Sequence, residues 1–211
     1  MQPAFTVEMA VKSINCYRIC STAYVRPHNG FGSTLGNGGR WNTPKCACIY
    51  SGSNRSIAQL EWVSHFLVNT ADFPKLSVIT YSVPEDLIIE ADLSAHSDWI
   101  TDDTVTKTIG DQFLIDKKYL ALKVPSTMDS KEFNYIINPL YPKFSEKLNV
   151  VDDTEALVVN KRFYEIKEYV KAALSTALAT RLGTEAKIAK YTAPDASVPI
   201  SRIHRVGRRK R

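Results

Sequence analysis

The chain has 211 residues, of which 44% are hydrophobic and 23% charged, values typical of a folded globular protein. It contains no apolar run near the roughly 18 residues of a membrane span and no secretion signal at its start, so we expect a cytoplasmic protein without a membrane role. Six of the cations behind its net charge of +5 lie in residues 202–211, and without them the chain carries a net charge of −1. Because this body is near neutral and lacks a basic, aromatic-rich face, direct nucleic-acid binding is not expected.

Two predicted strands flank a glycine-rich loop. Residues 14–20 and 46–50 have the composition of strands, and residues 30–39 between them hold five of the nine glycines. The loop is followed by Arg40, whose guanidinium is well shaped to grip a phosphate. The loop contains neither a P-loop nor a dinucleotide-binding Gly-x-Gly-x-x-Gly motif. Two interpretations remain open, a loop that binds pyrophosphate or a nucleotide, and a turn with an exposed arginine.

A helix is predicted over residues 56–69, with Ser56 and Gln59 forming a capping box. Apolar side chains surround most of its axis, so we expect it to be buried. Glu61 lies on its one narrow polar stripe. A carboxylate on a buried helix is costly unless it is paired or used. Glu61 is therefore either a structural residue, on a partly exposed stripe or in a salt bridge to a core arginine, or a functional residue.

The middle of the chain alternates strands with irregular segments. Residues 85–107 are polar and irregular, a short helix is predicted over 108–116, and Ser126 lies at a strand end, where site residues often occur. Further strands are predicted over residues 76–83, 119–124, 133–138 and 156–160.

The four cysteines do not form a recognisable metal motif. Their spacings, Cys-x3-Cys and Cys-x-Cys, lack the histidines of zinc fingers, and each cysteine falls in a predicted strand. We therefore expect small buried hydrophobes, with neither a metal site nor disulfides: Cys16, Cys20, Cys46 and Cys48.

The C-terminal part differs from the rest. Apolar residues recur at helical spacing from Arg162 to Leu182, and Gly183 is a plausible cap. The sequence thus divides into a domain over residues 1–162, an amphipathic helix over 163–183 and a basic, flexible tail over 184–211. Three roles of the helix and tail stay open: binding a partner, forming a homo-oligomer, and delivery.

Several segments together resemble the RES family, named for its arginine, glutamate and serine. Their order and spacing fit the family across about residues 14–162: Tyr17-Arg18-Ile19, Gly38-Gly39-Arg40-Trp41-Asn42, Ile49-Tyr50, Ala58-Gln59-Leu60-Glu61, Ile109-Gly110-Asp111, Leu122-Lys123-Val124-Pro125-Ser126 and Asn134-Tyr135-Ile136-Ile137-Asn138-Pro139. One departure is Tyr141, at a position where the family pattern leads us to expect a histidine.

The resemblance implies an α+β fold similar to ADP-ribosyltransferases, with a mixed β-sheet core, flanking helices and a cleft for NAD. Members of the family are bacterial toxins of toxin–antitoxin pairs that deplete NAD by hydrolysis or phosphorolysis, and some are reported to transfer ADP-ribose. The usual partner is an antitoxin with a helix-turn-helix DNA-binding part, which blocks the cleft. NAD is the substrate, so the resemblance implies no separate cofactor and no metal.

The resemblance also implies a set of functional residues. They comprise Arg40, Tyr50, Glu61 and Ser126 for catalysis, and Arg18, Arg40, Tyr50, Ser126 and Asn138 for binding NAD.

Physical chemistry agrees with these roles. Two arginines suit a pyrophosphate, and a fixed carboxylate such as Glu61 stabilises the positive charge that develops on the ribose. The ring of Tyr50 can stack on a flat ring, and Ser126 can hydrogen-bond the ribose or the nicotinamide amide.

Two alternatives to NAD degradation remain at this point. A mono-ADP-ribosyltransferase that modifies a protein would use the same residues, because both reactions break the same bond. A non-catalytic module would use the basic tail to bind nucleic acid, with a steep dependence of its affinity on salt.

Overall fold

The computed structural model describes residues 11–67 and 74–160, together with the helical positions 162–166, 168–169, 172, 175–176 and 180–181. The chain divides into two units, Met1–Lys167 and Glu168–Arg211. In the second unit the described positions are helical, as predicted for this part of the chain, while Gly183 and the basic tail lie outside the described residues. The sheet and the predicted site residues all belong to the first unit.

The first unit is built on one mixed sheet of seven strands in the order β4-β5-β6-β2-β1-β3-β7. Its strands are β1 (Ser13–Ser21), β2 (Ile49–Gly52), β3 (Leu76–Pro84), β4 (Ile88–Glu90), β5 (Ala121–Pro125), β6 (Phe133–Ile137) and β7 (Asn149–Leu157). Only the β4–β5 pair is parallel. Three α-helices are described in this unit by range: α1 (Arg55–Leu67), α2 (Asp103–Asp116) and the short α3 (Phe144–Lys147). This arrangement confirms the predicted α+β fold with a mixed sheet and flanking helices.

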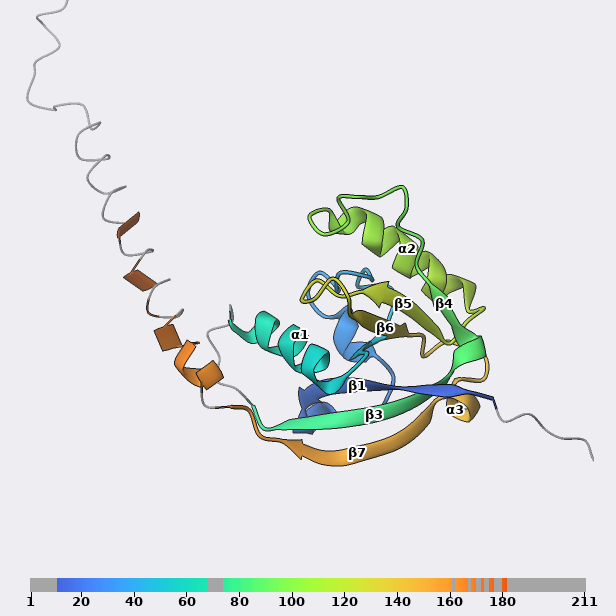
Figure 1. Ribbon diagram of the computed structural model, residues 1–211, viewed down its shortest axis with the longest axis horizontal. Helices are drawn as coiled ribbons and strands as arrows, with labels where there is room; N and C mark the ends of the chain where they lie inside the picture. The colour runs from blue at the N-terminus through green and yellow to red at the C-terminus, as the bar shows by residue number, and fades with distance from the viewer. Residues whose placement is uncertain are drawn as a thin grey trace, which may run out of the picture. The chain divides into compact units, whose positions relative to one another are not determined.

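The sheet consists of two parts that meet at a narrow join. β1 pairs with β3 over its full length, but it pairs with β2 only at Tyr17 and Gly52. The β1–β3–β7 part and the β2–β6–β5–β4 part can therefore diverge away from this pair. Figure 1 shows β1, β3 and β7 running below β5 and β6 in this view. The join also positions α1, because this helix follows β2 directly and packs against β1, β2 and β6.

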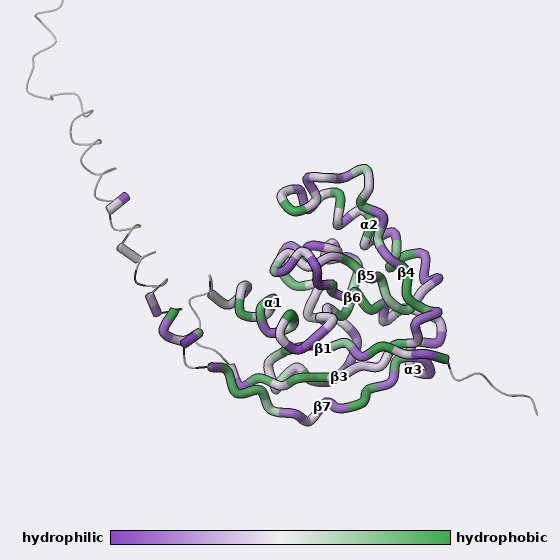
Figure 2. The backbone as a smooth tube through the Cα atoms, viewed as in Figure 1, coloured by the Kyte–Doolittle hydropathy of each residue, from purple (hydrophilic) through white to green (hydrophobic). Residues whose placement is uncertain are grey.

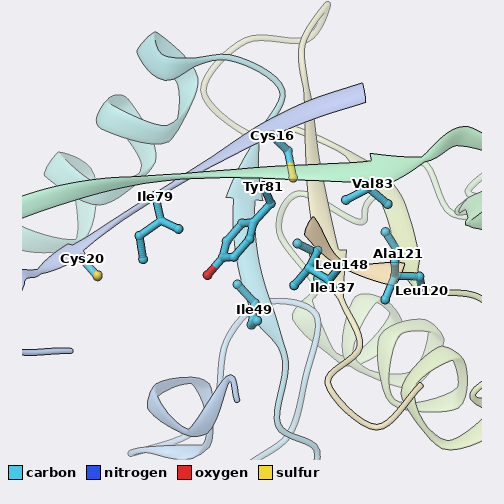
Figure 3. Packing of buried hydrophobic residues seen from close by; sticks show 10 residues of the cluster. All are labelled: Cys16, Cys20, Ile49, Ile79, Tyr81, Val83, Leu120, Ala121, Ile137 and Leu148. Carbon is cyan, nitrogen blue, oxygen red and sulfur yellow. The ribbon is translucent and has the colours of Figure 1, made fainter. Parts of the chain in front are cut away.

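The main hydrophobic core fills the space between these two parts of the sheet. In Figure 3 the ring of Tyr81 from β3 points toward Ile49 of β2, with Ile137 of β6 close by. Ile49, Tyr81 and Ile137 are each at most 1% exposed. In Figure 2, β3 is hydrophobic along much of its length, whereas the middle of the edge strand β7 is hydrophilic. A central strand covered on both faces is expected to have such an apolar sequence.

A second core joins α2 to the other side of the sheet. Phe113 and Leu114 of α2 pack with Leu122, Val124 and Ile136 from β5 and β6. This contact fixes α2 beside the loop that precedes β2, because Trp41 and Cys48 of that loop belong to the same cluster.

The structure confirms four predicted strands and corrects two others. Residues 14–20, 76–83, 119–124 and 133–138 correspond to β1, β3, β5 and β6. The strand predicted over 46–50 begins at Ile49, so Cys46 and Cys48 precede it. The strand predicted over 156–160 is β7, which begins at Asn149. Its charged residues obscured it in the sequence, because an edge strand needs little apolar content.

The helices also begin earlier than predicted. α1 begins at Arg55, and its amino end is capped by Asn54, whose Oδ1 accepts a hydrogen bond from the amide of Ile57 at 2.9 Å. Ser56 is therefore not the capping residue. α2 begins at Asp103 with Asp102 as its N-cap, inside the segment predicted to be irregular. Threonines in its first turns weaken the helical signal in the sequence.

Candidate active site

A cavity of about 610 Å³ lies among α1, the glycine-rich loop, the first turns of α2 and the ends of β5 and β6. Its volume is within the range of about 300–1,000 Å³ that is typical of small-molecule sites. Arg40, Tyr50 and Glu61 all contribute to its wall. The cavity therefore brings together three residues that lie in separate sequence segments.

Glu61 is held in place by two donors from the β5–β6 part of the sheet. Its Oε1 accepts hydrogen bonds from Ser126 Oγ at 2.8 Å and from Asn134 Nδ2 at 2.6 Å. Ser126 directly follows β5 and is 3% exposed, while Asn134 lies on the adjacent strand β6. Hydrogen bonds to an ionised acceptor are the stronger kind, so they fix the carboxylate at the cavity wall.

The turn between β5 and β6 also anchors the start of α1. Glu132 in this turn accepts hydrogen bonds from Ser53 Oγ at 2.6 Å and from Asn54 Nδ2 at 2.9 Å. The carbonyl of Glu132 accepts from the amide of Ser126 at 2.9 Å. Thus one residue contacts both the helix that carries Glu61 and the segment that carries its partner Ser126.

The glycine-rich loop is folded around the side chain of Asn42, which is fully buried. Its Nδ2 donates to the carbonyls of Ser33 at 2.9 Å and Cys46 at 2.8 Å. Its Oδ1 accepts from the amide of Gly39 at 3.0 Å. Since buried polar groups need partners, this network fixes the path of the loop before and after Arg40.

Tyr50 braces the same loop through its hydroxyl group. The hydroxyl donates to Asn42 Oδ1 at 2.8 Å and accepts from the amide of Trp41 at 2.9 Å. A Cβ atom at Gly39 would overlap with this hydroxyl, which explains why a glycine occupies that position. Burial raises the pKa of Tyr50 far above its usual value, so the phenol remains protonated and keeps its donor.

Arg40 is oriented by backbone carbonyls near the start of α2. Its Nη1 donates to the carbonyls of Ile100 at 2.9 Å and Trp99 at 3.3 Å. Its own carbonyl accepts from Thr106 Oγ1 at 2.7 Å. The rings of Trp41 and Trp99 contact each other with centroids 6.3 Å apart. Arg40 is therefore held at the cavity wall by contacts on one edge of its guanidinium.

α2 supports the loop at two further points. Asp111 accepts hydrogen bonds from the amide of Thr43 at 2.9 Å and from its hydroxyl at 2.7 Å. Gly110 lies so close to the carbonyl of Trp41 that a Cβ atom there would overlap with it. The matched segment Ile109-Gly110-Asp111 is thus the surface on which the loop rests.

The structure does not bring Arg18 and Asn138 to this cavity. Tyr17 and Ile19 of β1 line it, and Arg18 between them projects from the other face of the strand, where its Nη1 is buried without a hydrogen bond from the described residues. Asn138 is fully buried, and its Nδ2 donates to the carbonyl of Leu114 at 2.9 Å. Asn138 thereby fixes the end of α2.

Most residues of the cavity wall were not predicted as site residues, and Asn134 and Lys107 are two of them. Asn134 opens the Asn-Tyr-Ile-Ile-Asn-Pro segment, and strand alternation could have placed it beside Ser126. Lys107 also lines the cavity and pairs with Asp103 at 2.7 Å. No sequence signal marked Lys107, because the segment around it was predicted to be irregular.

A second cavity, of about 390 Å³, lies beside the middle of β7. Asp153 there accepts hydrogen bonds from Arg26 at 2.6 and 3.0 Å and lies 3.4 Å from Nε2 of His28. Burial lowers the pKa of His28. These charges are paired with one another, and none of the predicted site residues lines this cavity.

Fold and cavity together define an α+β protein with a carboxylate and an arginine fixed on the walls of one small-molecule site. The family model described as "RES domain" matches residues 15–160, so the chain belongs to the RES domain family. Among the described residues there is no helix that could cross a membrane, and no cluster of three or more potential metal ligands.

Curated relatives match more than half of this chain. A protein of Pseudomonas putida named Toxin Res is 32% identical over 119 residues, which are 55% of this chain and 81% of that protein. Toxin Res of Yersinia enterocolitica is 30% identical over 142 residues, or 64% of this chain and 90% of that protein. The Prs ADP-ribosylating toxin of a Sphingobium species is 29% identical over 121 residues, or 54% of this chain and 73% of that protein.

A solved structure shows the same fold. It is a chain from the crystal structure of the M. tuberculosis MbcT–MbcA toxin–antitoxin complex, with a TM-score of 0.53 and 14% identity. The alignment covers 74% of this chain and 90% of that one. At this identity the likeness concerns the fold.

Proposed function

We propose that this RES-domain chain is the toxin of a toxin–antitoxin pair and that it cleaves the bond between nicotinamide and ribose in NAD. The observation that carries the proposal is the carboxylate of Glu61, fixed by Ser126 and Asn134 at the wall of a cavity of about 610 Å³. The names of the curated relatives support the toxin role.

The chemistry requires a fixed negative charge beside the reacting carbon. When the nicotinamide leaves, positive charge develops on the ribose, as it does in glycoside hydrolysis. A carboxylate held in advance stabilises that charge without reorganising during the reaction. Ser126 and Asn134 both contact Oε1, and Oε2 accepts no hydrogen bond from the described residues. Oε2 is thus the oxygen free to face the ribose or to accept a proton from water.

The test is the consumption of NAD by purified protein, with and without phosphate, with the products separated by mass. Release of nicotinamide with plain ADP-ribose identifies a hydrolase, and ADP-ribose-1″-phosphate formed only with phosphate identifies a phosphorylase. Glu61→Gln keeps the size of the side chain but removes its charge, so we expect NAD loss to fall to background while the fold is retained. Normal turnover by this variant would exclude the role of Glu61.

Transfer of ADP-ribose to a protein is a second candidate, because one relative is named the Prs ADP-ribosylating toxin. The same fixed carboxylate suits both reactions, since both break the same bond. Labelled NAD distinguishes the two: label that remains attached to a denatured protein indicates transfer, and label in free ADP-ribose indicates hydrolysis.

The proposed partner is an antitoxin with a helix-turn-helix part that covers the cavity in the cytoplasm. The solved neighbour comes from a toxin–antitoxin complex, which supports such a partner. Expression of this chain alone should arrest growth, and co-expression of its cognate antitoxin should relieve the arrest. Arrest that persists with Glu61→Gln would contradict a toxicity based on catalysis.

A further inference from the structure

We propose that Lys107 and Arg40 form an anion subsite that binds the diphosphate of the substrate, and that Asp103 competes with the diphosphate for Lys107. The inference builds on the proposed function, since it names a subsite of the same cavity. It replaces the second arginine that the sequence had suggested. Arg18 lies on the other face of β1, whereas Lys107 contributes to the cavity wall.

The three charged groups form one cluster on one wall. Asp103 and Lys107 lie one helical turn apart on α2, and Lys107 Nζ is 2.7 Å from Asp103 Oδ2. The hydrogen bond from Lys107 is the main cause that lowers the pKa of Asp103, and the charge of Arg40 contributes as well. All three residues line the cavity. With two cations and one carboxylate, this wall carries a net positive charge.

Arg40 keeps donors available for a ligand. Its contacts with the carbonyls of Trp99 and Ile100 both involve Nη1. Those contacts hold the guanidinium plane, while Nη2 and Nε form no hydrogen bond with the described residues. A guanidinium held on one edge presents its other donors in a fixed geometry that suits a phosphate. The lysine adds a second, mobile positive charge.

The carboxylate of Glu61 lies elsewhere on the cavity wall. Glu61 is held by Ser126 and Asn134, which follow or belong to β5 and β6, whereas Arg40 and Lys107 come from the loop and from α2. An anion is repelled from the carboxylate and attracted to the two cations. The cavity therefore matches a molecule that develops positive charge on a ribose and carries a diphosphate next to that ribose, as a pyridine dinucleotide does.

Asp103 competes with a ligand phosphate for the ammonium group of Lys107. Its side chain is 56% exposed and that of Lys107 is 22% exposed, so a ligand phosphate can reach the lysine and displace the carboxylate. The ligand must break this ion pair and also approach a negative charge. Removal of the charge from Asp103 should therefore strengthen binding of a diphosphate, although it deletes a contact of the free protein.

The experiment measures calorimetric affinities for ADP-ribose and inorganic pyrophosphate, which require no turnover. Lys107→Met should raise the Kd of ADP-ribose by about tenfold and reduce its dependence on salt. Lys107→Arg should retain most of the affinity. Asp103→Asn should lower the Kd by a few fold. The matched control is Lys118→Met, because Lys118 also forms an ion pair, with Asp116 at 3.8 Å, but it does not line the cavity.

An unchanged Kd in Lys107→Met would overturn the subsite, and weaker binding in Asp103→Asn would overturn the competition. Circular dichroism of each variant checks the fold, and Lys107→Gln replaces the methionine variant if that protein does not fold. The outcome is separable from the proposed function, because ADP-ribose can bind through Lys107 even if the protein leaves NAD intact. If NAD is cleaved, Lys107→Met should raise KM with little change in kcat.

Discussion

The hydroxyl of Ser126 lies 2.8 Å from Oε1 of Glu61, although 65 residues separate them in the chain. The contact forms because β5 ends beside α1, and Glu132 ties the following turn to the start of that helix. The same oxygen of Glu61 accepts a second hydrogen bond, from Asn134. The position of the carboxylate thus depends on both donors.

Substitution of Asn134 tests the value of this second donor. Asn134→Ala removes a hydrogen bond to an ionised acceptor, which is worth about 1.5–3 kcal/mol. We expect kcat for NAD consumption to fall about 10- to 100-fold. Asn149→Ala, at an exposed position of β7, is the control and should retain full activity. Wild-type turnover by Asn134→Ala would show that Ser126 alone suffices to position Glu61.

Tyr50→Phe separates the two roles that Tyr50 can have. The variant keeps the ring, which can stack on a substrate, but removes the hydroxyl that contacts Asn42 and the amide of Trp41. We expect a loss of stability of about 1–3 kcal/mol in urea unfolding, because a buried amide loses its partner. KM for NAD should also rise as the loop loosens. If both stability and KM remain unchanged, the contribution of Tyr50 lies in its ring.

Two glycines of the loop should respond differently to alanine. A Cβ at Gly39 would overlap with the hydroxyl of Tyr50 and lie 2.9 Å from Asn42 Oδ1, while a Cβ at Gly32 would meet nothing within 4 Å. Gly39→Ala should therefore lower the free energy of unfolding by about 1–3 kcal/mol. Gly32→Ala should change it by less than about 0.5 kcal/mol. Equal effects of the two variants in chemical denaturation would contradict the packing seen at Gly39.

The ion pair between Arg26 and Asp153 should make stability depend on pH. The hydrogen bond from Arg26 lowers the pKa of Asp153 below the usual value of an aspartate. A depressed carboxyl pKa stabilises the folded state above the unfolded pKa, and this contribution is lost as the pH falls through the folded value. Arg26→Gln should thus be less stable than the wild type at pH 7, with a difference that shrinks below about pH 4. A difference that is equal at pH 7 and pH 3 would exclude this linkage.

Much of the fold was predictable because local patterns suffice for strands with regular composition. β1, β3, β5 and β6 combine apolar side chains with flanking turn residues, and all four lie where the sequence placed them. β7 and the first part of α2 were misplaced, because an acidic edge strand and a threonine-rich helix lack those patterns. In both cases tertiary contacts outweigh local propensity.

The sequence by itself determined the family and three residues of the cavity wall. Arg40, Tyr50 and Glu61 lie in local features, which are the Gly-Gly-Arg-Trp-Asn segment, the Ile-Tyr strand and the Leu-Glu helix. Tertiary structure alone decided which side chains meet. In the folded chain Asn134 donates a hydrogen bond to Glu61, and the hydroxyl of Tyr50 accepts one from the glycine-rich loop. Lys107 lies on the cavity wall, whereas Arg18 faces away from it. The physical reason is that a side chain on one face of a strand or helix makes a contact only when another element packs against that face. This packing is set by the arrangement of the whole sheet.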